Sequence, residues 1–363
     1  MPQIELKSLS KSYKTGRVLD NLSLVAEQGE IVCIFGPSGV GKTVLLRLIA
    51  GVETPDEGSI FLEGRDVTEA PPETRGVGIA FQNFALFPHM SAYDNIGSAL
   101  TARGASASTI KAKVEKVAAM LKISHVLSHA PRALSNGQKQ RTALARALAA
   151  DPKIVLLDDP LRNVDAKLRY EMRLELPSLL RASGATVLYV TQDYKEAMAI
   201  GDRIAVLIDG RFEQIAAPPA IYRGPSSVGV ARLFGDPTIN LIPINPRPQD
   251  GGPVCEIGGA TVGLGAAQAG TVGRAVLLGL RPETLNVVDQ SGPGAFPVDV
   301  VAVTPLNEKT VLLMRMRDGQ EIFASEAGIE SEARRPGPAF ARFDINRALL
   351  FDEASGARIE GRA

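Results

Sequence analysis

Residues 36–43 are the part of this chain whose residue types and spacing are best suited to chemistry. They read Gly36-Pro37-Ser38-Gly39-Val40-Gly41-Lys42-Thr43 and fit the pattern G-x-x-x-x-G-K-[ST]. Glycines let such a loop curl until its backbone N–H groups point inward at phosphate oxygens. Lys42 can then reach the β- and γ-phosphates, and the Thr43 hydroxyl can bind Mg²⁺. A glycine-rich turn before a helix is the structural alternative, but an apolar run precedes the motif as required, so we predict nucleoside triphosphate binding.

A second segment places carboxylates at the end of an apolar run. Residues 154–157 are Ile-Val-Leu-Leu, and Asp158 and Asp159 follow directly. A carboxylate at the end of a buried strand is costly unless a cation lies nearby, and Mg²⁺ beside a phosphate-binding loop supplies one. Asp158 is therefore the predicted Mg²⁺ ligand, with a simple strand-end turn as the structural alternative.

These motifs lie in a stretch whose pattern alternates between strands and helices. Strand-like runs occur before residue 82 and again at 154–157, 186–190 and 203–207, whereas residues 109–121 and 139–148 have helical spacing. We therefore predict an α/β domain over residues 1–235 with a helical subdomain at about 83–150. Residues 236–363 carry short strand-like runs between glycine and proline turns, which predicts a small β-barrel or sandwich.

Composition limits the class of protein further. The chain has 363 residues, with 40 basic and 40 acidic side chains, so its zero net charge argues against a nucleic-acid-binding protein. Its two cysteines are too few for a disulfide framework or a thiolate metal site. No signal-like segment opens the chain, and no run approaches 18 apolar residues. We expect a soluble protein of a reducing compartment that needs a partner to reach a membrane.

Several further motifs resemble the ATP-binding subunits of ABC transporters, in the order and spacing of that family over residues 4–235. Residues 134–138, LSNGQ, resemble the LSGGQ signature, and Gln82 within VGIAFQNFALFP resembles the Q-loop glutamine. Tyr13 sits where an aromatic residue stacks on adenine, RNVD at 162–165 resembles the D-loop, and VTQD at 190–193 occupies the switch region. Residues 81–90, FQNFALFPHM, and residues 278–283, LGLRPE, are most similar to the MalK-type ATPases of carbohydrate importers. The C-terminal module of those ATPases is a TOBE/OB-like β-barrel.

The resemblance implies an α/β P-loop NTPase fold and a dimer with two ATP molecules between its subunits. In that arrangement Gly36, Pro37, Ser38, Gly39, Gly41, Lys42 and Thr43 bind ATP, and Tyr13 stacks on its base. Ser135, Gly137 and Gln138 face the γ-phosphate held by the partner subunit. The implied Mg²⁺ ligands are Thr43, Gln82 and Asp158, and the implied catalytic residues are Asp159, Gln192 and Gln82. Phe84, Leu86, Phe87 and Met90 are candidates either for docking to a membrane domain or for internal packing.

Four positions depart from the family pattern, and they cluster on the chemistry. Asp159 stands where the family has the glutamate that polarises the attacking water, and Gln192 stands where it has the switch histidine. Asp159 is one methylene shorter, and Gln192 cannot carry positive charge. Asn136 replaces a signature glycine, and Arg162 replaces a small D-loop residue. We therefore predict that the chain binds ATP well and hydrolyses it slowly at its own site.

A slow site whose signature retains Ser135, Gly137 and Gln138 favours a heterodimer with a competent ATPase subunit, and the resemblance extends to glycerol importers, which have two different ATPase subunits. The implied partners are that second subunit, two transmembrane permease subunits and, indirectly, a substrate-binding protein, at the cytoplasmic face of a bacterial inner membrane. The alternative is a homodimeric, hydrolytically competent sugar-importer ATPase. A third alternative is a soluble ABC protein that acts on DNA or ribosomes, but a single cassette with zero net charge does not match that class well. A fourth is regulation through the C-terminal domain, which is compatible with either importer.

Overall fold

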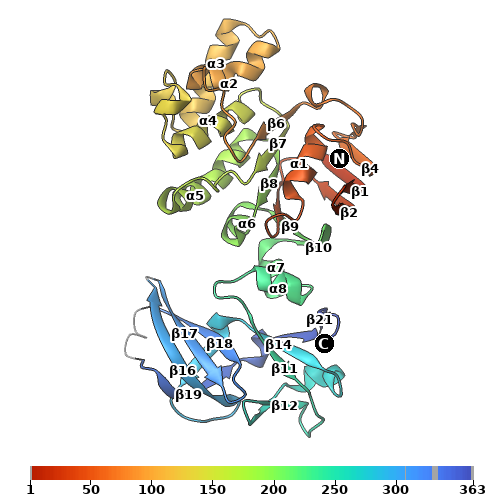
Figure 1. Cartoon of the computed structure of the whole chain (residues 1–363), viewed down its shortest axis with the longest axis vertical. Coiled ribbons are helices and arrows are strands. Elements are labelled where there is room, and N and C mark those ends of the chain that lie inside the picture. Colours follow the sequence, from red (N-terminus) through yellow and green to blue (C-terminus); the bar gives the residue numbers. More distant parts are fainter. Residues whose placement is uncertain (1, 307, 329–333, 361–363) are drawn as a thin grey trace. The chain divides into compact units, whose positions relative to one another are not determined.

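The computed structural model describes residues 2–306, 308–328 and 334–360 of the chain. It divides into two compact units, Met1–Ile221 and Tyr222–Ala363. The first unit alternates helices and strands, and the second consists mainly of strands (Figure 1).

The centre of the first unit is a six-stranded sheet in the order β10-β9-β3-β8-β7-β6. The strands are β3 (Ile31–Phe35), β6 (Val77–Ala80), β7 (Ile154–Asp158), β8 (Thr186–Thr191), β9 (Arg203–Ile208) and β10 (Arg211–Ala216). All neighbours pair in parallel except β9 and β10. Every residue of β3, β7 and β8 is buried, as expected for parallel strands covered on both faces. Their carboxyl ends therefore lie along one edge of the sheet.

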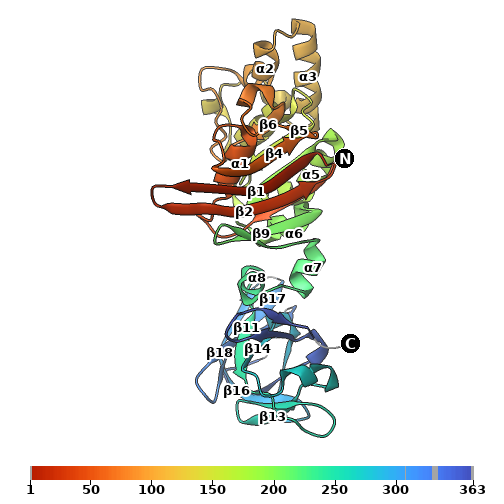
Figure 2. The same ribbon diagram turned by 90° about the vertical axis from the view of Figure 1, so that its right-hand side faces the viewer.

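A second, antiparallel sheet packs on the first through helix α1 (Lys42–Ala50). It has the order β2-β1-β4-β5, and β1 and β2 form a long hairpin (Figure 2). Its strands are β1 (Ile4–Tyr13), β2 (Gly16–Ala26), β4 (Glu57–Leu62) and β5 (Arg65–Asp66). Leucines of α1 share one buried cluster with residues of β1, β2, β3 and β7. This burial on both sides fixes the helix that follows the phosphate-binding motif.

Three helices are inserted between β6 and β7 and group together, away from β1, β2 and β4 (Figure 1). They are α2 (Ala92–Ala102), α3 (Ala107–Met120) and α4 (Asn136–Leu148). Ser91 and Ser135 each close a capping box at the start of α2 and α4. The remaining helices are α5 (Ala166–Ser183), α6 (Tyr194–Ile200), α7 (Pro218–Arg223) and α8 (Val228–Leu233). Short 3-10 turns lie at Pro72–Thr74, Ser124–Val126 and Pro131–Ala133.

The second unit is built from antiparallel strands around its own buried cluster. One sheet has the order β11-β14-β20-β21, and another has the order β15-β19-β16-β17-β18. The strands of the unit are β11 (Asn240–Ile244), β12 (Val254–Ile257), β13 (Ala260–Gly263), β14 (Val276–Leu280), β15 (Leu285–Val288), β16 (Ala295–Leu306), β17 (Lys309–Met316), β18 (Glu321–Ala327), β19 (Gly337–Phe343), β20 (Leu349–Asp352) and β21 (Arg358–Ile359). Among the residues that the structure describes in this unit, 3-10 turns lie at Ala266–Thr271, Pro282–Thr284 and Ile345–Arg347.

The architecture confirms the predicted fold class, an α/β P-loop unit with a helical subdomain followed by a strand-rich, OB/TOBE-like unit. The sequence pattern did not reveal α2 or the length of the β1–β2 hairpin. Among the described residues, no helix is both long enough and apolar enough to cross a bilayer.

Candidate functional site

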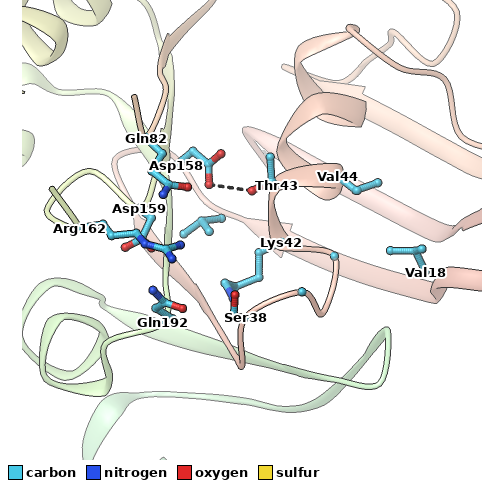
Figure 3. Close-up of a pocket in the computed structure, with 13 residues that line it drawn as sticks. Val18, Ser38, Lys42, Thr43, Val44, Gln82, Asp158, Asp159, Arg162 and Gln192 are labelled. Carbon is cyan, nitrogen blue, oxygen red and sulfur yellow. Dashed lines mark hydrogen bonds and ion pairs between the residues drawn. The ribbon is translucent and has the colours of Figure 1, made fainter. Parts of the chain in front are cut away.

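The carboxyl ends of β3, β7 and β8 frame a cavity of about 300 Å³ in the first unit. It collects most of the residues that the sequence predicts for phosphate, metal and water (Figure 3). It is lined by Val18, Ser38, Gly39, Gly41, Lys42, Thr43, Val44, Gln82, Asp158, Asp159, Arg162, Val190 and Gln192. Segments that are far apart in the sequence thus meet at one site.

The phosphate-binding loop is held in shape by its own lysine. The Lys42 ammonium donates to the carbonyl oxygens of Gly36 and Pro37 at 2.8 and 2.6 Å. A Cβ atom on Gly36 would lie 2.2 Å from the Leu207 carbonyl oxygen, so only glycine fits there. Gly41, with φ of 104°, turns the chain directly into α1. Gly36 and Pro37 thus shape the loop, while Ser38, Gly39 and Gly41 face the cavity.

Lys42 and Asp158 are charged groups in a largely buried place. Burial lowers the pKa of Lys42 and raises the pKa of Asp158, and each group opposes the shift of the other. The Thr43 hydroxyl donates to Asp158 Oδ1 at 3.1 Å (Figure 3). A hydroxyl and a carboxylate oxygen are therefore adjacent beside the phosphate loop, which is the kind of ligand pair that Mg²⁺ prefers.

Asp159 lies one residue further, where the chain leaves the sheet. Its backbone has φ of 45°, a left-handed conformation that aspartate tolerates better than most residues. Its N–H donates to the Val190 carbonyl at 2.9 Å, which ties it to the end of β8. Burial raises the pKa of Asp159, and the Arg162 guanidinium, 3.8 Å away, opposes that rise. Gln192 lines the same cavity. Asp159 and Gln192, the two residues that differ from the family's glutamate base and switch histidine, therefore lie at one site.

Gln82 and Arg162 interact on the β7 side of the cavity. With its amide oxygen turned toward the guanidinium, Gln82 accepts from Arg162 Nη1 and Nε, each at 3.3 Å. The Asn163 amide donates to the Gln82 carbonyl at 2.9 Å, so the Q-loop segment and the loop after β7 are joined twice.

The other predicted nucleotide contacts lie outside this cavity. Tyr13, at the end of β1, is 42% exposed and hydrogen-bonded to Glu53. Ser135, Gly137 and Gln138 lie at the start of α4, where the Gln138 side chain accepts from the Ser135 N–H at 2.9 Å. A Cβ atom on Gly137 would lie 2.1 Å from Leu168 Cδ2, so a larger residue there would require the Leu168 side chain to move. Their roles toward a nucleotide stay predictions.

Three apolar lining residues were not anticipated. Val18, Val44 and Val190 come from β2, α1 and β8, where their sequence context is that of ordinary core residues. Arg162 was noticed only as a departure from a family pattern. Val190 begins the switch motif and Arg162 begins the D-loop motif, but neither was a predicted site residue, and Val18 lies in no motif. Their place in the lining follows from the tertiary packing around the loop.

A second cavity, of about 570 Å³, lies between β6, α2 and α4. Phe87 lines it and is 43% exposed, whereas Phe84, Leu86 and Met90 do not line it. Arg146 of α4 donates to the Phe84 and Ala85 carbonyls, which fixes this segment against the helical group. Of the four apolar docking candidates, Phe87 alone combines exposure with a place in the cavity wall.

Comparisons with known proteins agree with this geometry. The family model described as ABC transporter matches residues 19–162. The chain is 41% identical over 362 residues to the sn-glycerol-3-phosphate import ATP-binding protein UgpC of Ruegeria sp. (strain TM1040), covering 99% of each chain. It is 36% identical over 354 residues to the protein of the same name from Vibrio cholerae, covering 96% of this chain and 93% of that one.

Similarity extends to solved structures of isolated cassettes. A dimeric ATP-binding cassette in a post-hydrolysis state, bound to ADP and phosphate, superimposes with a TM-score of 0.54 at 33% identity. The match covers 59% of this chain and 98% of the cassette. The likeness therefore concerns the first unit.

Proposed function

This chain belongs to the ABC transporter ATP-binding family, and we propose that it is the motor subunit of a bacterial importer for a polyol phosphate such as sn-glycerol 3-phosphate. The observation that carries the proposal is the cavity that unites Lys42, Thr43, Asp158 and Asp159. The full-length relatives named for sn-glycerol-3-phosphate import support the substrate class. In this proposal residues 1–235 form the ATPase domain, with its helical subdomain at about 83–150, and residues 236–363 form a regulatory or dimerisation domain.

The cavity suits the triphosphate of ATP together with Mg²⁺. Lys42 would exchange its two carbonyl partners for β- and γ-phosphate oxygens, where its charge is better compensated. Thr43 and Asp158 would hold the metal, with Gln82 as a third ligand. When bound, Mg²⁺ neutralises charge on the β- and γ-phosphates.

Asp159 is the base candidate of the site. Its carboxylate lies beside Asp158 in the wall of the cavity, where it can accept a proton from a water that attacks the γ-phosphorus. Gln192 can donate a hydrogen bond to the phosphoryl group from the end of β8. The proposal therefore includes hydrolysis at this chain's own site.

Two copies of this chain, rather than a heterodimer, are the better-supported assembly. The heterodimer expectation rested on Asp159 and Gln192 and gains no support from the comparisons. The relatives are single ATP-binding proteins that match over almost their whole length, and the similar cassette is described as dimeric. In a two-fold dimer Ser135 and the start of α4 would face the partner's γ-phosphate.

The cavity beside Phe87 is the proposed docking place for a transmembrane permease subunit. It lies against β6, the strand that leads into Gln82, so a partner seated there could influence the Q-loop. Attachment through permease subunits, which in turn receive substrate from a binding protein, would place the chain peripherally at the cytoplasmic face of the inner membrane.

Nucleotide titration of the purified chain tests the proposal. The natural chain should bind ATP with Mg²⁺ and release phosphate, whereas Lys42→Ala should lose at least about tenfold in ATP affinity because a charge-assisted phosphate contact is removed. Arg211→Ser, which removes an exposed ion pair outside the cavity lining, is the matched control. A chain that neither binds nor hydrolyses ATP would contradict the proposal.

A further inference from the structure

Arg162 points into the cavity, but the proposed binding and hydrolysis of ATP give it no role (Figure 3). The backbone makes a tight turn at this place, because the Arg162 N–H donates to the Asp159 carbonyl at 3.2 Å. This turn brings the guanidinium back over the carboxylate, with Nη1 at 3.8 Å from Asp159 Oδ2. The two side chains thus line the same wall, opposite Lys42.

Hydrogen bonds to neighbouring residues hold both the backbone and the side chain of Arg162 in place. Arg169 of α5 donates to the carbonyls of Arg162 and Val164 at 3.1 and 3.0 Å. With its amide oxygen turned toward the guanidinium, Gln82 accepts from Nη1 and Nε of Arg162, each at 3.3 Å. These contacts use Nη1 and Nε, and the Nη2 amino group takes part in none of them. With 44% of its side chain exposed, Arg162 keeps donors available for a ligand in the cavity.

The site lacks one charge that phosphoryl transfer needs. Charge spreads over the oxygens of the transferring γ-phosphoryl group, and a cation beyond the lysine and the metal stabilises it. Gln192, at the switch position, cannot supply that charge. Arg162 lines the same cavity as Gln192 and carries a permanent charge in a planar fork that matches phosphate oxygens.

We propose that Arg162 replaces the missing switch cation, contacting the γ-phosphoryl group of ATP bound in its own subunit and stabilising it during transfer. This inference rests on the proposed ATPase function. In the step, a bond forms between the water oxygen and the γ-phosphorus, and the bond from that phosphorus to the β–γ bridging oxygen breaks. ADP leaves with the electron pair, inorganic phosphate is formed, and the water proton passes to Asp159.

The competing explanation is that Arg162 only orients Asp159. Both roles make Arg162→Ser slower, and a phosphoryl contact predicts a loss of about 10²-fold or more in the ATPase rate. The two roles differ in their effect on ligand affinity. An arginine that acts only through Asp159 predicts equal losses of ATP and ADP–vanadate affinity, whereas a phosphoryl contact predicts a larger loss for ADP–vanadate, because the contact strengthens as charge develops on the transferring group.

The experiment compares the natural chain with Arg162→Ser, Arg162→Lys and the double variant Arg162→Ser, Gln192→His. We measure the ATPase rate and the affinities for ATP and for ADP with vanadate, which imitates the transferring group. Arg162→Ser should weaken ADP–vanadate binding at least about tenfold more than ATP binding. Gln192→His should restore much of the loss in that background, and Lys should restore part of it.

Equal losses of ATP and ADP–vanadate affinity, or no rescue by Gln192→His, would each overturn the inference. Arg211→Ser controls for the general loss of an exposed arginine. The outcome separates the two proposals: an unchanged ATPase rate in Arg162→Ser refutes only the role of Arg162. Absence of ATP binding and hydrolysis in the natural chain refutes the proposed function itself.

Discussion

Asp159 has two roles, one in the backbone turn after β7 and one in the proposed hydrolysis. Its φ of 45° lies in a region that favours short polar side chains, and its carboxylate lies in the cavity wall. A glutamate at this position has one methylene more and reaches roughly 1 Å further toward an attacking water, and a displacement of that size can change a rate by about 10²-fold. The predicted slow hydrolysis therefore depends on side-chain length.

Replacing Asp159 by glutamate tests that dependence. We expect Asp159→Glu to raise kcat by about tenfold to a hundredfold, with a small loss of thermal stability because glutamate tolerates the left-handed backbone less well. Asp159→Asn, which keeps the size but cannot accept the proton, should lower kcat by about 10²-fold or more. Steady-state phosphate release at saturating ATP measures both variants. Equal rates for aspartate and glutamate would show that the site is adapted to the shorter side chain.

At the scale of elements, we expect the start of α4 both to cap the helix and to contact the nucleotide of a partner subunit. Ser135 closes a capping box with Gln138, and Ser91 closes one with Asp94 at the start of α2. Ser135→Ala and Ser91→Ala should each lower the free energy of unfolding by about 1 kcal/mol, because each removes the same kind of cap. If Ser135 also contacts the partner's nucleotide, Ser135→Ala alone should lower the ATPase rate, by about tenfold or more. Equal rates in the two variants, at similar melting temperatures, would leave Ser135 as a cap only.

The elements also show what the sequence could predict and why the rest escaped it. The strands β3, β7, β8 and β9 are continuous apolar runs, and the expected segments agree with them within one or two residues. Helix α2 escaped because glycine, serine, asparagine and aspartate weaken its helical signal, while its stability comes from packing on α3 and α4. The motif residues Ser38, Gly39, Gly41, Lys42, Thr43 and Asp158 meet in the cavity, as the local sequence pattern implied. Val18 and the guanidinium of Arg162 depend on the tertiary course of β2 and of the loop after β7, which no local pattern encodes.

At the scale of the whole molecule, the cavity is only half of the site that the family resemblance implies. Lys42 and Asp159 lie in the cavity, whereas Ser135 and Gly137 lie outside its lining in the same chain. A dimer related by a two-fold axis would join the cavity of each copy to the α4 start of the other. Two nucleotides would then bind at equivalent interfaces, and hydrolysis would require contact between copies.

Mixing two inactive variants tests whether the sites are shared between copies of this chain. Lys42→Ala disables the phosphate loop, and Ser135→Arg disables the start of α4 by placing a bulky cation where a helix N-terminus disfavours it. Each variant alone should be inactive, while an equal mixture should recover up to about a quarter of the natural rate, because half of the random dimers are hybrids with one intact site of two. Melting curves establish that both variants are folded. If the natural chain hydrolyses ATP but the mixture recovers nothing, the sites are not shared between copies. A natural chain that hydrolyses ATP only after a different ATPase subunit is added would instead favour the heterodimer.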